Sequence, residues 1–179
     1  MPPIDLIALD LDGTLLDAND DISHGNRHAV RAALAAGIRV VLVTGRGADV
    51  PARLVRELEL NLPAICAHGA LTRDFLSGRT LGHIPIPLPH ALRMIRFAER
   101  RHLDVAVYFE ERFLRLEGSQ LYMEDMLGPH WSEVRSISET VKAPPTMVRF
   151  MGRRSVEAMR GEFGDLPLDF KYEAWGEFE

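Results

Sequence analysis

The sequence predicts an α/β protein with a parallel, doubly wound sheet in its first part and a second unit with an antiparallel sheet after it. The first part is predicted because strand and helix patterns alternate over about the first 70 residues with short connections. The second unit is predicted because hairpin patterns replace this alternation further along the chain. We expect the first unit over residues 1–81 and the second over residues 82–179.

The elements of the first unit follow from local signals. Residues 4–10 are nearly all apolar, which is typical of a strand covered on both faces. Ser23 is the expected N-cap of a helix over residues 24–36, and Gly37 is a natural stop. The remaining elements of this unit are expected to be a strand at 38–43, a helix at 48–60 and a strand at 63–67.

The second unit begins after a hairpin of residues 71–75 and 80–84, which turns at Ser77 and Gly78. Three prolines then make a stiff crossing segment. The expected elements after it are a helix at 90–101, strands at 104–109 and 113–117, a short helix at 120–127, a strand at 146–151, a helix at 155–163 and a strand at 168–175. Trp131 and Trp175 are expected to pack within this unit.

The composition excludes several classes of protein. Apolar residues make up 46% of the 179 residues and charged residues 26%, which is ordinary for a soluble globular protein. The net charge of −5 gives no reason to expect a nucleic-acid partner. Cys66, the one cysteine, excludes an internal disulfide and is expected to be a buried thiol. With neither a signal peptide nor a membrane span in the sequence, we expect a cytoplasmic protein.

Two aspartates at the end of the first strand carry most of the functional information. Asp10 and Asp12 alternate with leucines, so an extended chain projects both carboxylates to the same side. Gly13 then permits a sharp turn. Two neighbouring acids repel each other, and a divalent cation is the usual remedy. Hard cations such as Mg²⁺ prefer carboxylate oxygens, so the pair predicts a site for a divalent cation.

The other two strands of the first unit also end in polar residues. The second strand runs into Thr44, Gly45 and Arg46, and the third into His68 and Gly69. The carboxyl ends of parallel strands meet at one edge of the sheet, where ligands bind. Three further acids nearby, Asp17, Asp20 and Asp21, are expected to be solvated loop charges.

Two motifs together resemble the haloacid dehalogenase (HAD) superfamily, and more narrowly its Cof-type phosphatases. They are Asp10-Leu-Asp-Gly-Thr-Leu-Leu-Asp17 and Val43-Thr44-Gly45-Arg46. That group carries an α/β cap, of type IIB, inserted after the third core strand. The corner His68-Gly69-Ala70, followed by a hairpin, matches the point of insertion. The resemblance implies a Rossmann-like core and phosphoryl transfer through an aspartyl-phosphate.

The resemblance also implies a role for each matched residue. Asp10 looks like the nucleophile and Asp12 like the general acid and base. The Asp10 carboxylate and the backbone carbonyl of Asp12 would bind Mg²⁺. The phosphate would be held by Thr44, Gly45, Arg46 and Gly13. Arg46 would assist with phosphate or pin the loop; read without the family, it could instead be a surface ion-pair partner. His68 and Gly69 would contact substrate or brace the hinge; many relatives have asparagine in place of His68.

One departure from the family concerns residues beyond the second unit. The family needs a lysine after the cap and then an acidic loop that completes the Mg²⁺ shell, whereas this sequence ends at Glu179. Lys171 lies too early to be assigned as that lysine. At about 30 residues per βα unit, roughly 60 residues are expected to be missing. The first strand would then be an edge, so we expect a fragment, pairing with a separate polypeptide, or self-association.

The leading hypothesis is a Mg²⁺-dependent phosphatase that acts on small phosphorylated metabolites. Two alternatives stay open. One is a catalytically incomplete fragment that only binds a ligand or a partner. The other is a phosphomutase of the same fold, which would use the same aspartyl nucleophile. Sugar phosphates, nucleotides and a flavin or pyridoxal phosphate all remain possible substrates.

Overall fold

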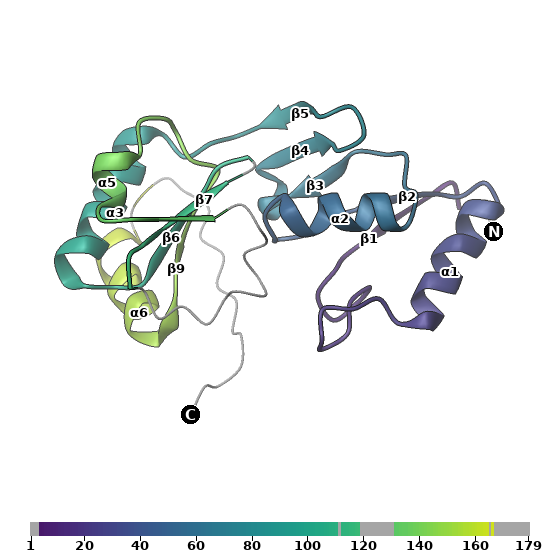
Figure 1. The fold of residues 1–179 in the computed structure, drawn as a ribbon, viewed down its shortest axis with the longest axis horizontal. Helices are drawn as coiled ribbons and strands as arrows, with labels where there is room; N and C mark the ends of the chain where they lie inside the picture. The colour runs from purple at the N-terminus through teal and green to yellow at the C-terminus, as the bar shows by residue number, and fades with distance from the viewer. Residues whose placement is uncertain (1–3, 111, 119–130, 165, 167–179) are drawn as a thin grey trace.

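The first group of elements in the computed structural model forms a βαβαβ unit (Figure 1). The structure describes residues 4–110, 112–118, 131–164 and 166. Strands β1 and β2 pair in parallel, with Leu6 opposite Arg39. Val43 forms a parallel bridge with Ile65, which brings β3 beside β2. The elements are β1 (Leu6–Leu9), α1 (His24–Ala35), β2 (Arg39–Leu42), α2 (Asp49–Glu57) and β3 (Ala64–Cys66).

The predicted alternation of strands and helices is confirmed, and local signals explain it. The Ser23 hydroxyl accepts a hydrogen bond from the backbone amide of Asn26 at 3.1 Å, which caps α1 as predicted. Gly37 follows the helix with φ 80°, a left-handed conformation that glycine adopts without strain. Helix α2 turns Leu54 and Val55 into the core beneath β2 and β3.

One expectation for β1 is wrong. Its residues are alternately exposed and half-buried, and Leu6 is 43% exposed, so β1 is not covered on both faces. Within the described residues, β1 pairs only with β2. The apolar run marks a strand correctly, but its coverage depends on which elements lie against it.

A short 3₁₀ turn, η1 (Ala67–Gly69), reverses the chain after β3. The predicted hairpin follows as β4 (Leu71–Asp74) and β5 (Arg79–His83). Strand β3 pairs antiparallel with β4, and β4 pairs antiparallel with β5. The hairpin therefore extends the core sheet and leads toward the second group of elements (Figure 1).

The second group is a four-stranded sheet with helices α3, α5 and α6 packed on one face. Val105, Val107 and Leu114 face these helices in one hydrophobic cluster. The strand order is β8-β7-β6-β9. The elements are α3 (Leu88–Arg101), β6 (Val105–Tyr108), β7 (Phe113–Leu116), β8 (Trp131–Val134), α5 (Ile137–Thr140), β9 (Met147–Phe150) and α6 (Gly152–Phe163).

This second sheet differs from the prediction in one pairing. It is not purely antiparallel, because β7 and β8 run parallel, with Phe113 opposite Trp131. A parallel pair needs a connection of about a dozen residues or more, and the chain between β7 and β8 is long enough. Strand β8 and helix α5 have no counterpart among the predicted elements. The helix predicted at 120–127, the strand predicted at 168–175, Lys171 and Trp175 lie outside the described residues.

In the described part of the chain, no helix combines the length and the apolar character that crossing a membrane requires.

Candidate active site

The ends of the three core strands lie together, as predicted. The amide of Val43 donates to the carbonyl of Leu9 at 3.0 Å, just where β1 and β2 end. The amide of Thr44 donates to the carbonyl of Ile65 at 2.9 Å, which joins the end of β2 to β3. Asp10, Thr44 and the η1 turn therefore share one edge of the sheet.

The turn after β1 leaves the two predicted catalytic acids in different surroundings. Leu11 and Leu15 are buried at 0% and 1% exposure and anchor the turn in the core. The amides of Leu15 and Leu16 both donate to the carbonyl of Leu11, at 3.0 and 2.9 Å. Gly13 has φ 68°, which explains the glycine in the motif. Asp10 is left exposed at the strand end, whereas Asp12 is half-buried.

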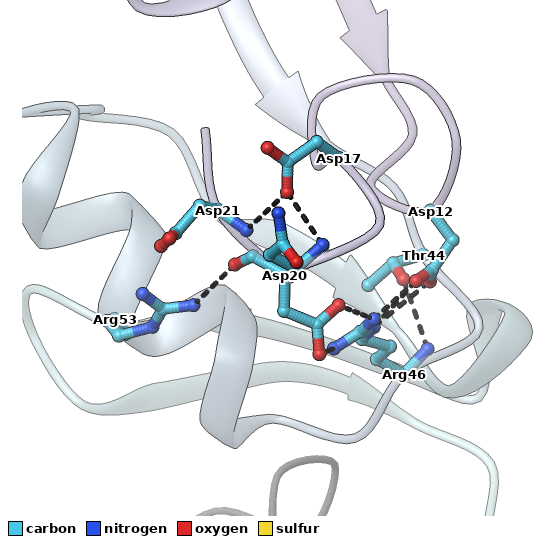
Figure 2. A network of polar contacts seen from close by, with 8 residues as sticks. Asp12, Asp17, Asp20, Asp21, Thr44, Arg46 and Arg53 are labelled. Atoms are coloured by element: carbon cyan, nitrogen blue, oxygen red, sulfur yellow. Dashed lines mark hydrogen bonds and ion pairs between the residues drawn. The ribbon is translucent and has the colours of Figure 1, made fainter. Parts of the chain in front are cut away.

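Arg46 binds Asp12 and is the centre of the polar network (Figure 2). Its side chain comes from the end of β2 and is only 7% exposed. Its Nε lies 3.0 Å from each oxygen of the Asp12 carboxylate, and its Nη2 also donates to Asp12. Its Nη1 donates to Asp20 at 3.1 Å, and Nη2 contacts Asp20 as well. Both carboxylates thus share one guanidinium.

The charge of Arg46 is stabilised by these two acids. Burial, the largest effect, acts to lower its pKa, because a charged group loses its hydration. The hydrogen bonds that Arg46 donates to Asp12 and Asp20, together with the negative charges of these acids, outweigh that effect and raise the pKa of Arg46 above its ordinary value. The guanidinium therefore keeps its charge at neutral pH.

The prediction for the three loop acids is wrong at Asp20. Asp20 is 33% exposed and binds Arg46, so it is not a solvated loop charge. Asp17 organises the turn, because its Oδ1 accepts from the amides of Asn19 and Asp21 at 2.8 and 3.2 Å. Asp21 is exposed, as expected. Sequence reasoning missed Asp20 because Arg46 is 26 residues away and no local pattern marks the contact.

Thr44 and Gly45 connect this network to the η1 turn. Thr44 is 3% exposed, and its Oγ1 accepts from the amide of Arg46 at 3.1 Å. The amide of His68 donates to the carbonyl of Thr44 at 3.2 Å. A Cβ on Gly45 would lie 2.3 Å from Cε1 of His68, so only glycine allows the imidazole to lie there.

The η1 turn that presents His68 has an unusual backbone. Ala67, His68 and Gly69 have φ values of 50°, 54° and 95°. For residues other than glycine, this left-handed region costs energy and persists only where the surroundings impose it. The amide of Ala67 donates to the carbonyl of Arg46 at 2.8 Å, which ties the turn to the segment that follows β2. His68 is exposed at the edge shared with Asp10.

The donor groups at this edge suit a magnesium ion with few protein ligands. Asp10 offers an exposed carboxylate, and carboxylate and carbonyl oxygens are the donors that Mg²⁺ prefers. Over the described ranges, no group of three or more histidine, cysteine or acidic residues is placed to hold a metal. Mg²⁺ commonly keeps several waters and takes only one or two carboxylates, so the donors present fit such a site.

One residue of the second sheet reaches the edge of this site. The ring of Tyr108, at the end of β6, lies beside Gly47, where a Cβ would be 3.3 Å from its Cδ1. Gly47 directly follows Arg46 in the sequence. Tyr108 stacks on Phe113 with ring centres 5.2 Å apart, on the sheet face opposite the helices. The second sheet therefore meets the core next to the Arg46 network.

Comparison with known proteins identifies relatives along most of the chain. The pyridoxal phosphate phosphatase YbhA of Escherichia coli is 27% identical over 154 residues, which are 81% of this chain and 57% of that protein. The 5-amino-6-(5-phospho-D-ribitylamino)uracil phosphatase YwtE of Bacillus subtilis is 46% identical over 69 residues, which are 38% of this chain and 23% of that protein. The chain thus spans little more than half the length of the first of these relatives.

The fold is also that of known structures. TM0651 from Thermotoga maritima superposes with a TM-score of 0.75 at 20% identity, over 92% of this chain and 64% of that one. Residues 7–152 match the sequence profile of a family described as haloacid dehalogenase-like hydrolases. These residues include the Asp10–Asp12 pair, the Arg46 network and all four strands of the second sheet. The chain belongs to the haloacid dehalogenase-like hydrolases, and its relatives are the Cof-type phosphatases of that family.

Proposed function

We propose that the protein is a Mg²⁺-dependent phosphatase that hydrolyses small phosphate monoesters through an aspartyl-phosphate. The observation that carries this proposal is the arrangement of the two acids. Asp10 is exposed at the strand end, while Asp12, two residues later, is half-buried and held by Arg46. Two carboxylates in such different surroundings suit two different roles, one as nucleophile and one as proton carrier.

In this proposal, the reaction takes place in two steps. An Asp10 oxygen attacks phosphorus in line, and the bond from phosphorus to the leaving oxygen breaks while Asp12, which enters this step protonated, donates its proton to that oxygen. Asp12, now a carboxylate, takes a proton from water as the water attacks the aspartyl-phosphate, which releases phosphate and restores Asp10. Bound Mg²⁺, held by the Asp10 carboxylate and the Asp12 carbonyl, would supply charge neutralisation on the phosphoryl group.

The phosphate-binding groups in this proposal come from the two neighbouring turns. Backbone amides near Gly13 and Gly45 can form a small anion-binding nest, and the Thr44 hydroxyl can donate to a phosphoryl oxygen. Among the alternatives for Arg46, pinning the loop is favoured, because both donor edges of its guanidinium face carboxylates. His68 and Gly69 are proposed to border the substrate, since His68 is exposed at the same edge.

The substrates in this proposal are small organic phosphates. The two relatives are named for phosphatases of pyridoxal phosphate and of a phosphorylated ribitylaminouracil, and both names describe small phosphorylated molecules. The second sheet would select among such substrates, because Tyr108 brings it to the edge of the site. The names of these relatives do not favour the phosphomutase or the binding-only alternative.

The test compares the purified chain with its Asp10→Asn variant on p-nitrophenyl phosphate. We expect turnover with MgCl₂, loss of turnover on chelation by EDTA and recovery on adding Mg²⁺. The Asp10→Asn variant should show no turnover while keeping its circular dichroism spectrum, because an amide is a poor nucleophile. Asp21→Asn, which removes an exposed acid nearby, should leave turnover unchanged. Turnover that survives in Asp10→Asn would refute the proposal.

We also propose that β1 pairs with a second copy of the chain. Ile4 and Leu6 are 66% and 43% exposed, and among the described residues β1 has a strand partner on one side only. An apolar strand edge of this kind favours pairing with another chain. Size-exclusion chromatography with light scattering should show a dimer that Leu6→Lys dissociates. A monomer at high concentration would count against this association.

A further inference from the structure

Two carboxylates contact Arg46, although its side chain carries a single positive charge. One carboxylate is enough to neutralise one guanidinium, and Asp12 already occupies the edge formed by Nε and Nη2. Asp20 occupies the second edge, formed by Nη1 and Nη2. With both acids ionised, the three side chains carry a net charge of −1, and Arg46 lies between the two acids (Figure 2). Neutralisation alone does not require the second carboxylate.

The turn that carries Asp20 is built to present it to Arg46. Asp20 has φ 59°, a left-handed conformation that aspartate tolerates better than most residues. The amide of Asp20 donates to the carbonyl of Asp17 at 3.2 Å, and the Asp17 carboxylate holds the rest of the turn. Arg53 of helix α2 donates to the carbonyl of Asp20 at 3.4 Å. The position of Asp20 is thus fixed from its own turn and from α2.

We propose that Asp20 is a positioning residue that fixes the plane of the Arg46 guanidinium and, through it, the orientation of the Asp12 carboxylate. This role rests on the proposed function, in which Asp12 exchanges a proton with the substrate oxygen. Asp12 and Asp20 share Nη2, so the guanidinium cannot rotate without weakening its contacts with both acids. Without Asp20, one edge of the guanidinium loses its acceptor and only Asp12 restrains it.

The test uses two substitutions that the backbone at this position accepts. Asparagine and glycine both adopt a left-handed conformation, so Asp20→Asn and Asp20→Gly should fold. Asparagine keeps one acceptor oxygen without the charge, whereas glycine keeps neither. Asp21→Asn is the matched control. It removes the same charge from the next residue in the chain, whose side chain is exposed.

The first measurement does not depend on activity. In proton–nitrogen NMR spectra, the Nε–H signal of Arg46 is assigned by its loss in Arg46→Lys, and its exchange with solvent is measured. We expect slow exchange in the unmodified chain and in Asp21→Asn. Exchange should be about tenfold faster in Asp20→Gly and intermediate in Asp20→Asn, because the restraint on the guanidinium is lost in steps. Circular dichroism confirms that each variant is folded at the temperature used.

A purely structural role for Asp20 would lower the melting temperature without changing the Arg46 signal of the folded protein. Unchanged exchange in both Asp20 variants therefore overturns the proposal, whether or not the chain hydrolyses phosphate esters. Where p-nitrophenyl phosphate is hydrolysed, we expect kcat to fall about tenfold in Asp20→Gly with KM within about twofold. Absence of hydrolysis in the unmodified chain would count against the proposed function, and the exchange measurement would still decide the role of Asp20.

Discussion

The imidazole of His68 occupies the space that a side chain on Gly45 would need. A Cβ on Gly45 would lie 2.3 Å from Cε1 and 2.7 Å from Nε2 of the ring. Favourable carbon contacts are about 3.5–4.0 Å, so the two groups cannot coexist without movement. Since Gly45 follows β2 and His68 follows β3, their contact closes the space between the two strand ends.

We therefore expect Gly45→Ala to move the His68 ring away from the site. The ring is exposed and can rotate into solvent, so the free energy of unfolding should fall by only about 1 kcal/mol. His68→Asn, with a shorter side chain that tolerates the left-handed backbone, should relieve the overlap. Urea unfolding of the two single variants and the double variant measures the coupling. Additive effects would show that the ring is not what Gly45→Ala displaces.

Gly47→Ala gives a matched comparison two residues away. Its Cβ would lie 3.3 Å from Cδ1 of Tyr108, so the ring needs to yield by only a few tenths of an ångström. We expect a smaller loss of stability than for Gly45→Ala and no coupling to His68→Asn. Urea unfolding of Gly47→Ala in both backgrounds tests this. A larger loss than for Gly45→Ala would mean that the contact between Tyr108 and the core is tighter than these distances indicate.

Glu110 connects the second sheet to the β4–β5 hairpin. Its carboxylate lies 3.2 Å from Nη1 of Arg73, accepts a hydrogen bond from Thr80, and lies 3.7 Å from Nδ1 of His83. Nε2 of His83 in turn lies 2.9 Å from the hydroxyl of Thr146, which precedes β9. Two separate contacts thus join the hairpin to the second group of elements.

Removing the charge of Glu110 should loosen the hairpin. Glu110 is 37% exposed, so solvent screening limits the expected cost of Glu110→Gln to about 1 kcal/mol. We expect faster hydrogen exchange at the amides of β4 and β5 than in the unmodified chain. This difference in exchange rate should be smaller at high salt, because salt screens the ion pair. Glu157→Gln, which breaks the exposed ion pair with Arg153, is the control and should leave these amides unchanged. Equal exchange in both variants would show that Glu110 does not hold the hairpin.

Signals confined to a few neighbouring residues predicted the strands and helices of the core correctly. The Ser23 cap, the left-handed Gly37 and the alternation of strands and helices all depend on local chemistry, and all are confirmed. The edge of the sheet that gathers Thr44 and His68 could also be predicted, because parallel strands bring their carboxyl ends together.

Features that depend on the path of the chain could not be predicted. The contact of Asp20 with Arg46 joins residues 26 positions apart, and a run of acidic loop residues looks the same whether or not a buried arginine lies beneath it. The parallel pairing of β7 with β8 depends on how the chain returns to the sheet. Strand β8 itself, Trp-Ser-Glu-Val, has two polar residues side by side and so lacks the alternation of apolar and polar residues that would mark it.

Cys66 makes the stability of the protein depend on pH in the alkaline range. The thiol lies on β3 with no exposed surface, and burial raises its pKa from the ordinary 9.0 to about 12, although the charge of Arg73 acts in the opposite direction. In the unfolded chain the thiol ionises near pH 9, whereas in the folded protein it stays protonated. The free energy of unfolding is therefore unaffected below pH 9 and falls above it, until the folded thiol also ionises near pH 12.

The expected loss from this single group is about 1.4 kcal/mol between pH 8 and pH 10. Cys66→Ala removes the ionisable group, so the free energy of unfolding of this variant should fall less over this range, by that amount. The small cavity left by the substitution lowers the stability of the variant equally at both pH values and does not affect the comparison. Urea unfolding of both proteins at pH 8 and pH 10 gives the difference directly, and groups that titrate in both proteins cancel. An equal fall in the free energy of unfolding of the two proteins, or rapid labelling of the native thiol at pH 8, would show that Cys66 ionises in the folded protein.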